Sequence, residues 1–291
     1  MEGKIQKIGS SFWIKFFVLL AVETLESFGL AVDPDITDLR LSTPGIATFC
    51  IEYDYLNPLK KLIKLYANER QLQFFTTKDC SASTQAFDAR PLDLPKLTLL
   101  NLSKNKLTIM PDFSLMPALE KLILEGNMLN SVPSQPFTAN TKLVNLNLGT
   151  NGMTTLPSLT GSCSYMISIN LQGNEITSIP NDYFNGCIKL QTINLADNKL
   201  ISFDHSLCHV PHQVAITMSG NNRMSISDPY GLCPQQSTTI TVDSSHCDKS
   251  LCWLKSSQVQ VNDFACADGR MWSAVPKGDV CTGKFYLVFR F

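Results

Sequence analysis

The stretch LQTINLADNKL, residues 190–200, carries the pattern that decides the fold. Apolar residues stand at Leu190, Ile193, Leu195 and Leu200, and Asn198 lies between the last two of them. Four upstream segments repeat this arrangement, and their first apolar residues follow one another at intervals of 22 to 24 positions: Leu97, Leu119, Leu143 and Met166. A constant period of this length indicates a stack of equal structural units.

Each unit is predicted to contribute one short strand, and these strands are predicted to pair in parallel about 4.8 Å apart. The second and third apolar residues of a copy point inward, and the residue between them points outward. The pattern resembles that of leucine-rich repeat proteins. This resemblance implies an α/β repeat solenoid, a curved horseshoe whose parallel sheet lines the concave face.

The asparagine that closes the pattern is expected to be architectural. It stands where the chain leaves the strand and turns, so its amide can satisfy backbone groups that no neighbouring strand reaches. Six copies carry it, and these residues are predicted to form an internal ladder: Asn105, Asn127, Asn151, Asn174, Asn198 and Asn221.

The outward position between the two inner apolar residues is the candidate binding surface. It is held by Asn101, Ile123, Asn147, Asn170, Asn194 and Thr217, and flanking outward positions add Asn145, Ser168, Gln172, Thr192 and Ser219. This surface is rich in amides and hydroxyls and almost uncharged, so it should bind a protein or glycan through neutral hydrogen bonds with little salt dependence. The alternative is that exposed strands simply tolerate asparagine.

One asparagine on this surface is also a candidate for modification. Asn101 opens the sequence NLS, an N-x-S/T glycosylation acceptor. A glycan there would shield one end of the concave face and direct a ligand toward Asn147, Asn170 and Asn194.

The repeat becomes irregular at both ends. Weaker copies centre on Leu39 and Leu65 upstream, and on Ile216 and Ile240 downstream. This gives about nine units over residues 32–245, with the first two and the last two irregular, as expected for terminal repeats that face water on one side. For residues 57–66, a short amphipathic helix is an alternative to a strand.

The ten cysteines indicate a disulfide framework and an oxidising compartment. Four of them, together with Trp253, resemble the cysteine-rich C-terminal cap of extracellular leucine-rich repeat proteins, which places a cap at residues 246–291. The resemblance implies the pairs Cys247–Cys266 and Cys252–Cys281. The spacing departs from the family, because four residues rather than one separate the first two cysteines. A zinc site is the alternative, against which the absence of a CxxC pair argues.

The other six cysteines are candidates for further bonds. Cys163 and Cys187 each stand three residues before the first apolar residue of the next unit, so they should be stacked neighbours within bonding reach. Two buried thiols that act as small apolar groups are the alternative. Cys50 and Cys80 are candidates for tying the first two units together, and Cys208 and Cys233 also fall in adjacent units.

The N-terminus is predicted to be a secretory signal peptide, residues 1–31. Lys4 and Lys7 precede an apolar segment at residues 12–22, and Gly29 and Ala31 form a small-x-small cleavage pattern. The apolar segment is too short to span a bilayer, which requires about 20 residues. We therefore expect a secreted, extracellular protein without a membrane span that begins near Val32. A buried N-terminal helix is the alternative.

The sequence offers little for catalysis. The net charge of −1 gives no reason to expect a nucleic-acid partner. No nucleophile motif, phosphate loop or paired-carboxylate arrangement is evident. His205 and His209 would share a face if their segment were helical, but Pro211 favours an ordinary surface segment. We expect no cofactor, no metal and no enzymatic activity.

The resemblance implies a secreted leucine-rich repeat binding protein that recognises a protein or glycan on its concave face, in the setting of innate immunity. A soluble protein similar to a receptor ectodomain is one alternative. A non-catalytic subunit of a secreted enzyme, similar to the leucine-rich repeat subunit of some crustacean luciferases, is another.

Overall fold

The computed structural model describes residues 34–41, 51–77, 91–130, 132–201, 214–221, 239–241, 260–261 and 270–274. Several predicted features lie outside these residues. They are the signal peptide, the four cysteines of the cap (Cys247, Cys252, Cys266 and Cys281), the cysteines Cys50, Cys80, Cys208 and Cys233, and the histidines His205 and His209. They remain predictions.

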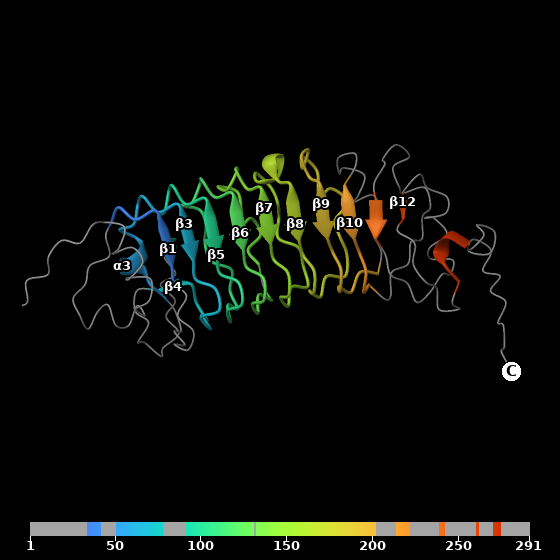
Figure 1. Cartoon of the computed structure of the whole chain (residues 1–291), viewed down its shortest axis with the longest axis horizontal. Coiled ribbons are helices and arrows are strands. Elements are labelled where there is room, and N and C mark those ends of the chain that lie inside the picture. Colours follow the sequence, from blue (N-terminus) through green and yellow to red (C-terminus); the bar gives the residue numbers. More distant parts are fainter. Residues whose placement is uncertain are drawn as a thin grey trace, which may run out of the picture.

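The described residues form a stack of short strands that pair in one parallel sheet (Figure 1). Its ten strands follow chain order: β1 (Asp38–Arg40), β3 (Lys64–Tyr66), β5 (Leu99–Asn101), β6 (Lys121–Ile123), β7 (Asn145–Asn147), β8 (Ser168–Asn170), β9 (Thr192–Asn194), β10 (Ala215–Thr217), β11 (Thr239–Thr241) and β12 (Gln260–Val261). The parallel repeat solenoid expected from the sequence is confirmed.

Smaller elements connect these strands. A second parallel pair consists of β2 (Ile51–Glu52) and β4 (Thr76–Thr77), and the short helix α3 (Tyr53–Leu56) follows β2 directly. Two 3-10 helices, η1 (Cys163–Tyr165) and η4 (Trp272–Ala274), complete the elements of the described chain.

The register of the sheet explains why apolar residues recur at fixed positions. The middle residue of each strand pairs with its equivalent in the next, and from β3 to β10 these residues are buried: Leu65, Leu100, Leu122, Leu146, Ile169, Ile193 and Ile216. A slip by one residue would turn the whole column toward water, so the apolar pattern specifies the register. On the other side of the core, Phe113, Phe137 and Phe184 are fully buried.

The closing asparagines bind backbone groups of two successive turns. Asn174 Nδ2 donates to the carbonyl oxygen of Leu171 in its own turn at 2.9 Å and to that of Leu148 in the preceding turn at 3.1 Å. Its Oδ1 accepts a hydrogen bond from the N–H of Met153 at 3.2 Å. The same three-way arrangement recurs at Asn105, Asn127, Asn151, Asn198 and Asn221.

The second unit, which contains β3, makes the equivalent contact with a different side chain. Arg70 occupies the asparagine position there and is 2% exposed. Its Nη1 donates to the carbonyl oxygen of Leu41, which corresponds to the preceding-turn carbonyl that each ladder asparagine binds. Asn105 Oδ1 in turn accepts from the N–H of Arg70 at 2.9 Å. The arginine therefore continues the ladder to the N-terminal end rather than interrupting it.

The turn after each strand has a uniform backbone conformation. The residue before the asparagine position has a positive φ in seven successive units: Glu69, Lys104, Gly126, Thr150, Gly173, Asp197 and Gly220. In this conformation the N–H of Asp197, for example, donates to the carbonyl oxygen of Ser219 in the next unit at 2.7 Å. Four of the seven are not glycine, although L-residues carry a steric cost there.

The irregular ends also join the sheet. Residues 64–66 form the strand β3, which excludes a helix over this part of residues 57–66. At the other end, β12 adds a strand at residues 260–261, within the segment that the sequence analysis assigned to the C-terminal cap. Its apolar Val261 pairs with Ile240 and extends the middle column of the sheet.

Two asparagines four residues apart provide a matched test of the ladder. Asn174→Ala should lower the free energy of unfolding by roughly 1–3 kcal/mol, because it leaves buried backbone groups unpaired. Asn170→Ala removes an amide from the half-buried outward face and should cost less than about 1 kcal/mol. Urea unfolding of both variants measures the difference. Equal losses would show that the two asparagines do not differ in role.

Candidate binding surface

The outward positions form two columns along the concave sheet. Alternate residues of a strand face opposite sides, and the middle residue of each strand is inward. From β5 to β10 the first column is Leu99, Lys121, Asn145, Ser168, Thr192 and Ala215, and the second is Asn101, Ile123, Asn147, Asn170, Asn194 and Thr217. The structure thus brings Asn147, Asn170 and Asn194 side by side on three adjacent strands, with Asn145, Gln172, Ile123 and Thr217 next to them.

The amides at the centre of this face bind one another. Asn170 Nδ2 donates to Asn147 Oδ1 at 3.0 Å, and Asn147 Nδ2 donates to Glu125 Oε2 at 2.8 Å. These bonds link three strands and end on a carboxylate. They hold the two amides in a defined relative orientation.

A second set of bonds joins the units of β8 and β9. Asn194 Nδ2 donates to Gln172 Oε1 at 3.0 Å, and Gln172 Nε2 donates to Asp197 Oδ2 at 2.9 Å. This set also ends on a carboxylate. We call the six residues of both sets the amide network: Glu125, Asn147, Asn170, Gln172, Asn194 and Asp197.

Backbone groups fix the amides further. The N–H two residues after each network asparagine donates to its Oδ1: Gly149 to Asn147 at 3.0 Å, Gln172 to Asn170 at 3.1 Å and Ala196 to Asn194 at 3.1 Å. Since the oxygen must face these donors, the amide nitrogen of each side chain is identified by its surroundings. The concave amides are preorganised rather than free.

The network leaves hydrogen-bonding capacity for a ligand. An amide nitrogen carries two N–H donors, and each of the four network amides uses one of them in the bonds above. Asn147 Oδ1 already accepts two bonds. The surface therefore presents N–H donors at fixed positions, with carboxylates at its two ends.

Sequence reasoning did not select Glu125 or Asp197. Both follow the third apolar residue of their units, by one and two positions. The one feature of the sequence that could have pointed to Glu125 and Asp197 is their position directly after the strands that carry the outward columns. Their role as hydrogen-bond acceptors for amides depends on side-chain positions that a repeat pattern does not contain.

Asn101 lies on the same face, between Tyr66 and Ile123 in the register. Its Oδ1 accepts from the N–H of Ser103 at 3.0 Å and from Ser103 Oγ at 2.7 Å. Its Nδ2 makes no hydrogen bond to the described residues, so the atom that an N-linked glycan would occupy is unobstructed by such a bond.

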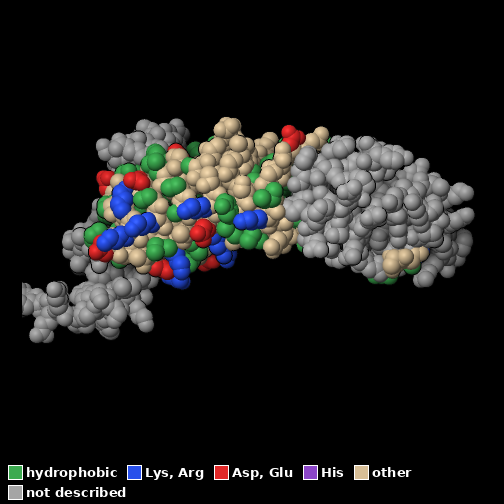
Figure 2. Space-filling model, turned by 90° about the horizontal axis from the view of Figure 1, so that it is seen from above, with side chains coloured by type: hydrophobic (Ala, Val, Ile, Leu, Met, Phe, Trp, Pro, Cys, Tyr) green, Lys and Arg blue, Asp and Glu red, His purple; other side chains and the backbone are tan. Residues whose placement is uncertain are grey.

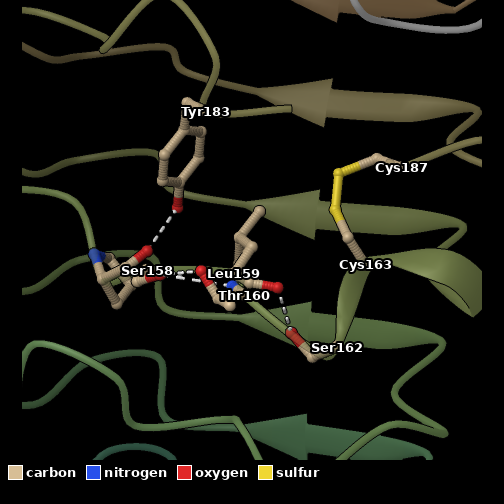
Figure 3. Close-up of a disulfide and its surroundings, with 8 residues drawn as sticks. Ser158, Leu159, Thr160, Ser162, Cys163, Tyr183 and Cys187 are labelled. Atoms are coloured by element: carbon tan, nitrogen blue, oxygen red, sulfur yellow. Dashed lines mark hydrogen bonds between the residues drawn. A yellow bond between two sulfur atoms is a disulfide. The ribbon is translucent and has the colours of Figure 1, made fainter. Parts of the chain in front are cut away.

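A disulfide supports the two strands at the centre of the network. Cys163 and Cys187 are joined, with Cα atoms 4.5 Å apart and a sequence separation of 24 (Figure 3). Both cysteines are buried and stand in the turns that lead into β8 and β9, which carry Asn170 and Asn194.

Two further polar side chains, one partly and one fully buried, tie the neighbouring turns. Tyr183 donates its hydroxyl hydrogen to the carbonyl oxygen of Pro157 at 2.9 Å, and burial raises the pKa of Tyr183 far above its usual range, which keeps it a donor (Figure 3). Asn140 Nδ2 donates to the carbonyl oxygens of Phe113 at 3.0 Å and Met116 at 2.9 Å. The sequence analysis selected neither residue.

Other kinds of site find no support in the described segments. They contain no group of three or more histidine, cysteine, aspartate or glutamate side chains placed to hold a metal ion. None of their helices is long and apolar enough to cross a membrane.

Comparisons with known proteins agree with the repeat solenoid described above. Residues 166–222 match the leucine rich repeat family. A chain from the Toll–Spätzle complex of Drosophila has a similar structure, with a TM-score of 0.50 and 18% identity over 78% of this chain and 38% of that one. A leucine-rich repeat protein of Leptospira interrogans is 18% identical over 75% of this chain and 57% of its own, with a TM-score of 0.45. No curated protein matches the sequence.

The fold is therefore that of a leucine-rich repeat protein. The family match supports this assignment over the central turns, and the Drosophila chain shows the same fold. The present chain spans less than two thirds of either solved structure, 38% of one and 57% of the other.

The disulfide should contribute measurably to stability. A crosslink of this sequence separation restricts the unfolded chain, so the double variant Cys163→Ala/Cys187→Ala should lose roughly 2–4 kcal/mol of unfolding free energy. Denaturant unfolding of the variant and the parent protein gives the difference. A variant as stable as the parent protein would contradict a stabilising role for this bond.

Proposed function

We propose that this chain is a secreted, non-catalytic binding protein that holds an extracellular protein partner on its concave face, over β6 to β9. The observation that carries this proposal is the amide network. It places N–H donors of fixed direction on an open surface whose carboxylates, Glu125 and Asp197, lie at its two ends. Preorganised groups of this kind lower the ordering cost of binding.

The composition of the surface favours a protein over a glycan. Half-buried apolar residues, Leu99 and Ile123, stand beside the amides, and protein interfaces combine apolar and hydrogen-bonding groups in this way. Neither outward column carries an aromatic side chain between β5 and β10. The similar fold within the Toll–Spätzle complex, described as a molecular hub in Drosophila development and innate immunity, supports a protein partner and an immune setting.

Secretion is part of the proposal and can be measured directly. The mature protein should begin near Val32, and a glycan on Asn101 should add mass that the variant Asn101→Gln lacks. Intact-mass measurement of protein secreted from animal cells tests both points. Alkylation without reductant should leave Cys247, Cys252, Cys266 and Cys281 unmodified; retention of Met1 or free thiols at these positions would contradict secretion through an oxidising compartment.

The concave site is tested with a triple variant. Asn147→Ala, Asn170→Ala and Asn194→Ala together remove the asparagines of the network, and affinity for a partner captured from extracellular fluid should fall at least about tenfold, since each lost hydrogen bond is worth about 1 kcal/mol. A matched control replaces three exposed polar residues outside the face: Asn130→Ala, Thr154→Ala and Ser178→Ala. Binding should be measured by interferometry after melting curves establish that both variants fold.

The outcomes separate the alternatives. Unchanged affinity of the folded triple variant would overturn the concave site. Loss of binding after enzymatic removal of glycans from the partner would identify a glycan ligand. Capture of a single enzyme in stoichiometric amount would instead identify this chain as the non-catalytic subunit of that enzyme.

A further inference from the structure

A second surface lies on the edge at which the strands begin. Five successive units enter their strands through the same turn, closed by a hydrogen bond from an N–H to the carbonyl oxygen three residues earlier: Leu97 to Leu94, Leu119 to Met116, Leu143 to Asn140, Met166 to Cys163 and Leu190 to Cys187. The residue before the donor is therefore structurally equivalent in all five turns.

This equivalent position alternates between cationic and uncharged residues. Along the solenoid it is held by Lys96, Ala118, Lys142, Tyr165 and Lys189. The three lysines are exposed, and Lys189 Nζ lies 4.2 Å from the centre of the Tyr165 ring, which places neighbouring members in contact. We call these five residues the basic edge. Figure 2 looks onto this side of the molecule and shows basic side chains interspersed with hydrophobic ones and with some acidic ones.

The lysines of this edge differ from most others in having no ion pair within the described chain. In the preceding unit, whose entry turn is closed by the same bond from Leu62 to Leu59, the equivalent Lys61 does pair with a carboxylate, that of Asp35. Elsewhere, Lys60 pairs with Asp93, Lys104 with Glu69 and Lys199 with Glu175. Lys96, Lys142 and Lys189 have no such partner among the described residues, nor do Lys64 and Lys121 at the starts of β3 and β6. Glu120 precedes Lys121 in the chain, and Asp38, the register neighbour of Lys64, pairs with Arg40. The edge therefore carries an excess of unneutralised positive charge.

Apolar surface separates the charges. Tyr165 is 52% exposed and Ile188, next to Lys189, is 72% exposed. A chain with a charge on every residue, such as a nucleic acid or a sulfated glycan, would pair with the lysines but leave the apolar residues between them without complementary contacts. A polypeptide that alternates acidic and apolar side chains would complement both kinds of residue.

The spacing selects the conformation of such a polypeptide. Neighbouring turns lie about 4.8 Å apart, so alternate turns place the lysines about 9.6 Å apart. A polyproline II segment returns to the same face every three residues, about 9.3 Å. An α-helix returns to the same face after seven residues, about 10.5 Å, which departs further from the spacing of the lysines than the polyproline II repeat does.

We propose that the basic edge binds an acidic, extended segment of a partner protein, with carboxylates at every third residue against Lys96, Lys142 and Lys189. Apolar side chains in the neighbouring row of the same three-residue repeat pack against the exposed ring of Tyr165. The segment runs along the solenoid axis. This surface is separate from the amide network, so the proposal stands independently of the concave site.

The test uses the full secreted chain and a labelled peptide with glutamate at every third position and proline and leucine between. A scrambled peptide of the same composition and a sulfated polysaccharide serve as competitors. Fluorescence anisotropy gives Kd for the parent protein, for Lys96→Gln/Lys142→Gln/Lys189→Gln and for the matched control Lys104→Gln/Lys106→Gln/Lys199→Gln, which removes the same charge from the opposite edge. Melting curves establish that both variants fold.

Affinity for the periodic peptide should fall about tenfold in the edge variant and less than about twofold in the control. Tyr165→Ala should also weaken binding without a change in charge. Three results would each overturn the proposal: no binding of the periodic peptide, equal losses in the two lysine variants, or a scrambled peptide that binds as tightly. Tighter binding of the polysaccharide, with no effect of Tyr165→Ala, would show that the edge attracts polyanions by charge alone.

Discussion

The bonds that the ladder asparagines make to the backbone are the interactions on which the rest of the solenoid depends. In seven successive units, from β3 to β10, a strand of only three residues is followed by a turn through a left-handed position. The backbone N–H and C=O groups at that turn have no hydrogen-bond partner in a neighbouring strand. Burying them unpaired would lower the free energy of unfolding. A single amide supplies bonds to its own turn and to the preceding one, so closing each unit also fastens it to its neighbour.

Two asparagines four residues apart perform opposite tasks in the same unit. Asn174 points inward and binds three backbone groups, whereas Asn170 points outward and binds another side chain. The direction of the side chain, set by its position in the strand, decides which task the amide performs. Because the ladder fixes the strand spacing, it also fixes the distance between outward amides. The architecture of the interior thus determines the geometry of the surface.

The sequence could predict what depends on period and direction. The apolar column, the inward asparagines and the outward ones all follow from the spacing of leucines around residues such as Leu171 and Leu195. It could not predict contacts that depend on side-chain reach. Arg70 substitutes for an asparagine because its longer side chain reaches the Leu41 carbonyl, and Glu125 and Asp197 accept bonds from amides on adjacent strands. No period marks these residues.

The two candidate surfaces respond differently to salt, and this difference bears on how they work together. The hydrogen bonds that the network's amides can donate to a ligand are neutral and change little with ionic strength, whereas the exposed lysines of the basic edge are screened over about 8 Å at physiological salt. The edge is therefore suited to raising the rate of encounter, and the concave face to holding the partner. A partner with a folded domain for the concave face and an acidic segment for the edge would gain further, because the second contact forms within one complex at a high effective concentration.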